Sequence, residues 1–359
     1  MSDMFDYLDW RGDIRFSQLP LNPVDALIFS TLSYIRFQGI ISDQPGHRIN
    51  LKDAADTLLS LEDAPSRCRT PKDLTLLRAA AETERFGNTG LSFYRDIFIP
   101  EEETQFAAMT FHMNDGTVFL AFRGTDSTLV GWKEDFNMTF QESIPAQRLA
   151  QEYIRDFAAV NRAPIWAGGH SKGGNLAVYA AAKSDQLIQA RIIEVYSQDG
   201  PGFSEAMMED PGYQRIIPKV RSFVPQSSVI GMLLEHEEPY TIVKSNQIGI
   251  MQHDPYSWEI LGPGFVPVEE LTEDSRFLDR TFKSWLAGMT NEERSDFFDT
   301  VFGLLASGDA SSVGEILHPE NVRTYFKTLQ TDGKMRQIIG SELLSLLESA
   351  RQAHQTKEK

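Results

Sequence analysis

The sequence contains a single cysteine, Cys68, among its 359 residues. One cysteine cannot form a disulfide within the chain or a cysteine-based zinc site, and we expect neither a metal nor a cofactor. Runs of basic residues are also missing, and 51 acidic against 34 basic residues give a formal net charge of −17. Such a surface repels phosphate backbones and anionic head groups, which argues against nucleic-acid binding.

Long hydrophobic runs are missing as well. No stretch approaches the roughly 18 uninterrupted apolar residues that a membrane-spanning helix needs. The first residues, MSDMFDYLDWRGDIRF, carry charges throughout and lack the apolar segment of a signal peptide. We therefore expect a cytoplasmic chain without a transmembrane segment, and the sequence indicates no oligomeric state.

Strand and helix patterns alternate over residues 92 to 260. Asn-Asp-Gly at 114–116 separates two β-rich runs, TQFAAMTFHM and TVFLAFRG, which predicts a hairpin. A helix near 145–160 precedes the apolar run PIWAGG and an alanine-rich helix, and the run FSEAMMEDPGYQRI predicts one further helix between two later strands. This order predicts an α/β protein with a mainly parallel central sheet and helices on both faces.

Helical patterns at both ends define the predicted domains. Residues 1–90 are predicted to be an N-terminal helical segment that packs on the core. It begins with an irregular arm, and a helix follows from Asn22 and Pro23, a capping residue and a proline at the first helical position. Residues 91–266 are predicted to be the α/β core, and residues 267–359 a C-terminal helical region.

The stretch AGGHSKGGNLAVYAAA holds the strongest chemical signal. Gly169-His170-Ser171-Lys172-Gly173 fits G-x-S-x-G, with a predicted strand before it and a predicted helix after it. This context is that of a nucleophile elbow, where a tight turn exposes the serine at the carboxyl edge of the sheet. A glycine-rich turn without chemistry is the plain alternative. A phosphate loop is disfavoured because the order G-x-x-x-x-G-K-[ST] is missing.

An oxyanion hole requires two donors beside the nucleophile. The amide of Lys172, the first residue after Ser171, is one candidate. The second is Thr125, which follows the predicted strand 117–122 and Gly124 and offers a backbone amide and a hydroxyl. Thr125 could instead cap a local turn.

A serine nucleophile requires a base, and in this fold the base follows it in the chain. Of the later histidines, His354 lies near the end of the chain and His318 precedes a proline in a helical region. His253 lies in a loop after an apolar segment, where the base is expected, and is our first choice. His236, which lies among acidic residues, is the alternative.

The triad acid is less clearly indicated. Asp199 ends the strand that follows the nucleophile helix, and carboxyl ends of strands are where site residues collect. We predict that Asp199 accepts the N–H of the base. Asp254 and Glu235 are alternatives, and Asp199 could also simply cap a Gly-Pro turn.

The segments FLAFRGTDSTLVGWKEDF and GGHSKGGNLAVYAA together resemble the class 3 lipase pattern of α/β-hydrolases. With VDALIFSTLSYIRF, SQDGPGF, VPQSSVIGMLLEHEEPYTIVKSN and QHDPYSWE, the chain more closely resembles a bacterial lipase-like family described as a domain of unknown function. The resemblance implies an α/β-hydrolase fold with helical N- and C-terminal extensions. It also implies Ser171 as nucleophile, Thr125 and Lys172 as oxyanion donors, and His253 as base. Class 3 lipases carry an aspartate where this chain has Ser228.

Two functions are compatible with these observations. The first is a serine hydrolase that cleaves an ester or acyl bond through Ser171, His253 and Asp199 and an acyl-enzyme. Its substrate would be a small-molecule ester or a lipid-like compound. The second is a catalytically weak or inactive hydrolase scaffold used for binding, which the serine at position 228 favours.

Overall fold

The structure is a computed structural model that describes all residues except 1, 127, 309–311, 313–314 and 356–359. The chain divides into two compact units. The first consists of Met1–Phe98, Phe106–Gly124 and Pro145–Leu271. The second consists of Ile99–Gln105, Thr125–Ile144 and Thr272–Lys359.

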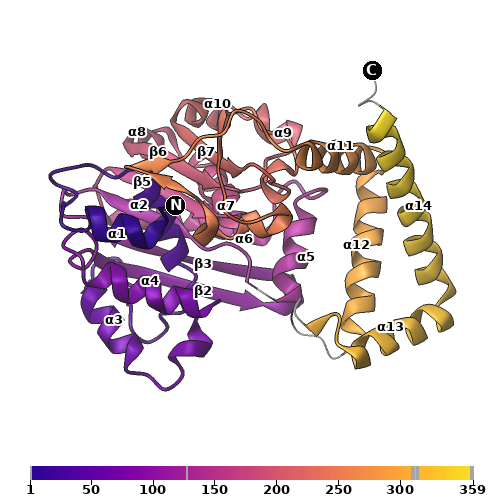
Figure 1. Cartoon of the computed structure of the whole chain (residues 1–359), viewed down its shortest axis with the longest axis horizontal. Coiled ribbons are helices and arrows are strands. Elements are labelled where there is room, and N and C mark those ends of the chain that lie inside the picture. The colour runs from indigo at the N-terminus through magenta and orange to yellow at the C-terminus, as the bar shows by residue number, and fades with distance from the viewer. Residues whose placement is uncertain (1, 127, 309–311, 313–314, 356–359) are drawn as a thin grey trace. The chain divides into compact units, whose positions relative to one another are not determined.

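Eight strands of the described residues form one sheet in which spatial neighbours are also neighbours in sequence (Figure 1). β3 and β4 form the predicted antiparallel hairpin, whereas β4 to β8 run parallel to one another. The predicted mainly parallel sheet is therefore confirmed. The strands are β1 Ile49–Asn50, β2 Gly90–Ile99, β3 Thr104–His112, β4 Val118–Phe122, β5 Ile165–His170, β6 Ile192–Gln198, β7 Val220–Pro225 and β8 Tyr240–Val243. A separate pair consists of β9 Ile260–Leu261 and β10 Gly264–Phe265.

Helices cover both faces of this sheet, as predicted. α7 (Lys172–Ala182) contacts β4, β5 and β6, and it packs against α6 (Pro145–Val160) and α10 (Pro211–Ile216). α2 (Pro23–Leu32) contacts the same three strands, so it lies on the opposite face. The connections between successive parallel strands are right-handed in nearly all proteins and place their helices on one face. The N-terminal segment supplies the second layer, and the chain has the α/β-hydrolase fold with helical extensions.

The start of α2 shows how local sequence fixes this layer. Asn22 caps the helix, Pro23 occupies the first position, and the Asp25 carboxylate accepts the backbone N–H of Asn22, which completes a capping box. Asp25 is fully buried and forms a two-point ion pair with Arg85, and it also accepts the hydroxyl proton of Tyr7. A charged pair inside an apolar layer thereby joins α2 to Arg85, which lies in the turn after the helix Pro71–Ala81.

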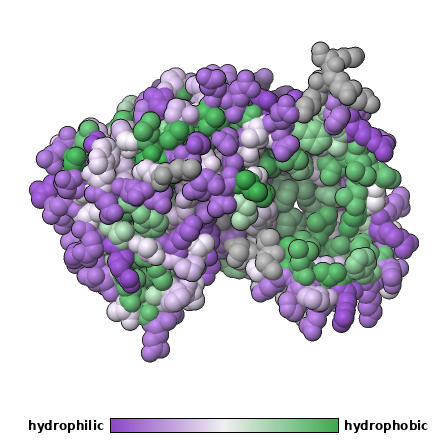
Figure 2. Space-filling model, viewed as in Figure 1, coloured by the Kyte–Doolittle hydropathy of each residue, from purple (hydrophilic) through white to green (hydrophobic). Residues whose placement is uncertain are grey.

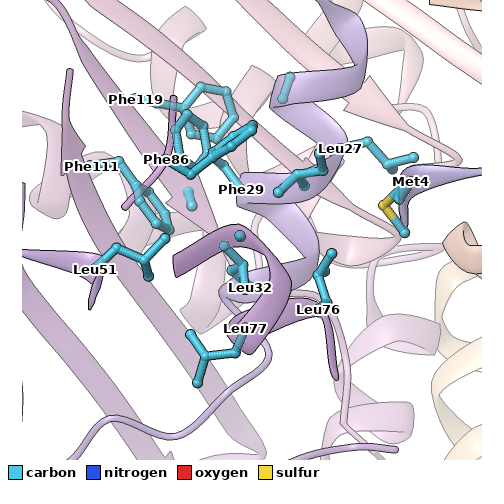
Figure 3. Close-up of a cluster of buried hydrophobic side chains, with 14 of the residues drawn as sticks. Met4, Leu27, Phe29, Leu32, Leu51, Leu76, Leu77, Phe86, Phe111 and Phe119 are labelled. Atoms are coloured by element: carbon cyan, nitrogen blue, oxygen red, sulfur yellow. The ribbon is translucent and has the colours of Figure 1, made fainter. Parts of the chain in front are cut away.

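An apolar cluster surrounds α2 (Figure 3). The ring centroids of Phe29 and Phe111 are 4.3 Å apart, and Phe119 on β4 lies 5.4 Å from Phe29. Each buried phenylalanine contributes about 1.5–3 kcal/mol relative to an exposed one. This packing joins α2 to β3 and β4.

Two expectations about individual segments are wrong. Residues 4–11 are a helix, α1 (Met4–Arg11), rather than an irregular arm, because Asp3 forms a capping box. The run FSEAMMEDPGYQRI forms two short helices, α9 (Glu205–Met208) and α10, because Asp210 and Pro211 begin a new helix there. The remaining helices of the first unit are α3 Leu51–Leu59, α4 Pro71–Ala81 and α8 Gln186–Arg191.

The second unit is helical and has its own aromatic core. Its helices are α5 Leu129–Asn137, α11 Glu273–Ala287, α12 Asn291–Ala306, α13 Pro319–Thr331 and α14 Gly333–Gln355. Phe298 stacks on Phe136 at a centroid distance of 4.7 Å. Figure 2 shows hydrophobic side chains gathered over the C-terminal helices. On α14, Leu343, Leu344 and Leu347 are exposed. No helix among the described residues is long and apolar enough to cross a bilayer.

Candidate active site

Ser171 lies at the turn between β5 and α7. Its backbone adopts φ 59° and ψ −135°, a conformation that costs a non-glycine residue about 1–3 kcal/mol. A Cβ at Gly173 would lie 2.1 Å from the Phe122 carbonyl oxygen, and one at Gly169 would lie 2.3 Å from the carbonyl carbon of Gly173. Both glycines are therefore required by close backbone approach. A strained serine held by such packing is typical of a nucleophile.

The end of β4 lies against this turn. A Cβ at Gly124 would be 3.2 Å from the Ser171 Cβ, 2.5 Å from the His170 carbonyl oxygen and 2.2 Å from the Tyr34 hydroxyl. Ser171 keeps 8% of its surface exposed, and its hydroxyl has no hydrogen-bond partner among the residues that the structure describes. Hydrogen bonds of catalytic groups are often long in ligand-free enzymes and shorten when substrate binds.

His253 and Asp199 form a hydrogen-bonded pair in the same unit. The Nδ1 of His253 donates to Oδ2 of Asp199 over 2.6 Å. The aspartate is completely buried, whereas the imidazole side chain is 26% exposed. Asp199 directly follows β6 with φ 54°, and its N–H donates to the Phe223 carbonyl on β7 over 2.7 Å. The pair thus combines a fixed, water-excluded carboxylate with a partly accessible ring.

The second carboxylate oxygen of Asp199 is held by the segment that follows β7. The Ser228 hydroxyl donates to Oδ1 over 2.5 Å, and the Gly231 amide donates to the same oxygen over 3.1 Å. A Cβ at Gly231 would lie only 2.3 Å from Oδ1. Ser228 therefore contacts the carboxylate directly.

The loop that carries His253 is fixed from both sides. The Gln252 side-chain oxygen accepts the Ser227 amide over 2.8 Å, and its backbone carbonyl accepts the buried indole N–H of Trp258 over 2.9 Å. These bonds connect the histidine loop to the segment after β7, from which Ser228 reaches Asp199.

His170 adds a second ring beside the first. Its centroid lies 4.5 Å from that of His253, and its Nε2 lies 2.8 Å from the His253 carbonyl oxygen. Since a carbonyl only accepts, Nε2 carries the proton, and Nδ1 accepts from the Tyr34 hydroxyl at 3.1 Å. Complete burial, and then the charges of His253 and Arg69, lower the pKa of His170 well below its usual value. His170 is a neutral ring that supports the histidine loop.

The predicted oxyanion donors lie in different units. Lys172 is the first residue of α7, so its amide adjoins Ser171 at the positive end of the helix dipole. Thr125 directly follows Gly124 in the chain and begins a segment of the second unit. Its hydroxyl donates to the Asp135 carboxylate at 2.5 Å, so that proton is already engaged.

The alternative acids and bases have other partners. His236 pairs through Nδ1 with Glu238 at 3.0 Å and does not bond Asp199. Asp254 forms an exposed ion pair with Lys72 at 3.7 Å. His318 is the residue that precedes α13 in the second unit. Among the described residues, no group of three or more histidine, cysteine or acidic side chains is arranged to hold a metal ion.

With this geometry, a comparison with known proteins becomes informative. A protein-family model matches residues 80–303, more than half of the chain. The chain belongs to the Mbeg1-like family. This family is lipase-like, as the resemblance to class 3 lipases predicted. The match includes Gly124, Ser171, Asp199 and His253.

The Mbeg1-like chain is also similar to three lipases of solved structure. M37 lipase is 14% identical, with a TM-score of 0.38 over 58% of this chain and 69% of its own. Rhizomucor miehei lipase in its propeptide complex is 14% identical, with a TM-score of 0.33 over 68% and 81%. A fungal lipase in an inhibitor complex is 14% identical, with a TM-score of 0.32 over 55% and 82%. No curated protein matches the chain significantly.

Sequence reasoning missed four residues of the site in this Mbeg1-like chain. Tyr34 and His170 form the support behind His253, and Ser228 and Gly231 hold Asp199. The sequence shows Ser228 at the place of an expected acid, which suggests that the acid has been lost rather than that Ser228 contacts an acid elsewhere. Tyr34 lies more than 130 residues before Ser171, and no local pattern indicates that it is close to His170.

Proposed function

We propose that this protein is a serine hydrolase of lipase type that cleaves an ester or acyl bond. Ser171 attacks the substrate carbonyl, His253 takes up the hydroxyl proton, and Asp199 stabilises the imidazolium that forms. The proton then passes to the leaving alcohol. Water, deprotonated by the same ring, releases the acyl group from Ser171 and regenerates the enzyme.

The observation that carries this proposal is the 2.6 Å bond between His253 and a buried Asp199 in the unit that holds the strained Ser171. With Nδ1 donating to the carboxylate, the other ring nitrogen, Nε2, is left as the acceptor, the tautomer that a general base requires. The buried aspartate at the end of β6 supports a complete triad although position 228 carries a serine.

The oxyanion that forms during attack requires donors next to Ser171. We assign one to the amide of Lys172, because it begins α7 and lies at the positive end of the helix. Thr125 is the proposed second donor through its backbone amide, because it adjoins Gly124, whose position against Ser171 brings the end of β4 to the nucleophile.

The substrate class follows from the family and the charge of the chain. A lipase-like family supports an ester with an apolar acyl group. The net charge of −17 disfavours docking on anionic lipid surfaces, so a small or lipid-like ester fits better.

A fluorophosphonate probe tests this function, because it phosphorylates an activated serine and leaves other serines unmodified. Labelling of the folded wild-type protein, lost in Ser171→Ala, is expected together with hydrolysis of p-nitrophenyl esters. Ser184→Ala is a matched control, since Ser184 lies just beyond α7 and its hydroxyl donates to the Ala180 carbonyl, away from Ser171 in the chain. An unlabelled and correctly folded wild-type protein would instead favour a scaffold used for binding.

A further inference from the structure

We propose that Ser228 and the Gly231 amide are positioning groups that orient Asp199 for the triad. This inference rests on the proposed function. It assigns a role to the serine that occupies the place of an acid in the related lipase pattern. In this chain the carboxylate follows β6, and the hydroxyl that supports it follows β7.

The contacts of Asp199 divide between its two oxygens. Among the described residues, Oδ2 accepts from the His253 ring alone, whereas Oδ1 accepts from the Ser228 hydroxyl and the Gly231 amide. Asp199 is completely buried and Ser228 is 1% exposed, so the side chains of the protein replace water around Oδ1. The two donors on one oxygen fix the rotation of the carboxylate and direct the other oxygen at the imidazole.

Burial of a carboxylate disfavours its charged form unless hydrogen-bond donors compensate. Ser228 and Gly231 supply two such donors. Gly231 also donates to the Ser228 hydroxyl oxygen over 3.1 Å, which fixes the direction in which that hydroxyl points. The Gly231 amide therefore orients the Ser228 hydroxyl, and both donors orient the Asp199 carboxylate.

Removal of the Ser228 hydroxyl has a specific chemical consequence. Among the described residues, the Gly231 amide would then be the only donor left on Oδ1, so the carboxylate would be less firmly directed at the imidazole. The misdirected carboxylate should lower kcat.

The experiment compares the kcat and KM of steady-state ester hydrolysis by wild type, Ser228→Ala and Ser222→Ala. Ser222 is the matched control because it is a buried serine on β7, the strand that precedes Ser228, and its hydroxyl has no partner among the described residues. We expect Ser228→Ala to lose roughly 10- to 100-fold in kcat, the range for one hydrogen bond to a charged group, with little change in KM. Ser222→Ala should keep the wild-type kcat and KM.

A third variant separates the hydrogen bond from packing. Ser228→Cys retains a side chain of similar size with a weak donor, so its kcat should fall between those of wild type and Ser228→Ala. Equal kcat values in the cysteine and alanine variants, or a wild-type kcat in Ser228→Ala, would overturn the inference and leave the proposed hydrolase intact. Absence of hydrolysis in wild type itself would overturn both.

Discussion

A methyl group at position 231 tests the geometry of the site directly. The Cβ of Gly231→Ala would lie 2.3 Å from Oδ1 of Asp199, 2.9 Å from the Ser228 hydroxyl oxygen and 2.9 Å from a Val224 methyl group. Non-bonded carbon and oxygen atoms require about 3.4 Å or more between buried neighbours. The carboxylate or the segment around position 231 must therefore move by about 1 Å.

Such a movement has a calculable effect on rate. Misplacement of a catalytic group by about 1 Å lowers turnover by about 100-fold. Val224 is packed in the sheet, so the Asp199 carboxylate, which is linked to His253 by a hydrogen bond, takes up much of the shift. We expect kcat to fall by about two orders of magnitude, with a much smaller change in KM.

Ester hydrolysis and the rate of fluorophosphonate labelling measure this effect, and a thermal melt shows whether the variant is folded. Gly264→Ala is the control, because a Cβ there meets no atom within 4 Å. A folded Gly231→Ala that turns over at the wild-type rate would refute the assignment of Asp199 as the acid.

Three further predictions concern other parts of the chain. Arg85→Ala leaves Asp25 as an uncompensated buried charge and should lower the free energy of unfolding by about 3–5 kcal/mol in urea titrations; a loss below about 1 kcal/mol would contradict this. Burial lowers the pKa of His112 to about 4, whereas the unfolded chain binds the proton near 6.5. The contribution of His112 to the free energy of unfolding is therefore complete above about pH 6.5 and is lost as pH falls towards 4, up to about 3 kcal/mol. His112→Gln should thus flatten the decline in stability with falling pH that urea unfolding measures. An unchanged slope would argue against a neutral His112. Finally, His253→Ala should abolish most ester turnover and His236→Ala should retain it; the reverse ranking would identify a different base.

Much of the fold followed from local patterns. Asn22, Pro23 and Asp25 define the start of α2 through contacts within one helical turn, and Asn-Asp-Gly at 114–116 defines the hairpin of β3 and β4. The nucleophile turn was equally local, because strand, turn and helix lie within 18 residues and the glycines are required by backbone contacts around Ser171. Asp210 and Pro211 form a helix-start signal within the run FSEAMMEDPGYQRI, for which the sequence analysis predicts a single helix.

The sequence alone determined most of the elements and the tight turn at Ser171, since short-range sterics and hydrogen bonds decide those. Only the tertiary structure decided which groups meet there. Asp199 and Ser228 come from the ends of adjacent parallel strands, and their contact depends on the register of β6 and β7. Tyr34 and His170 meet because α2 covers the second face of the sheet. Such convergence depends on packing between segments distant in the chain, which no local pattern records.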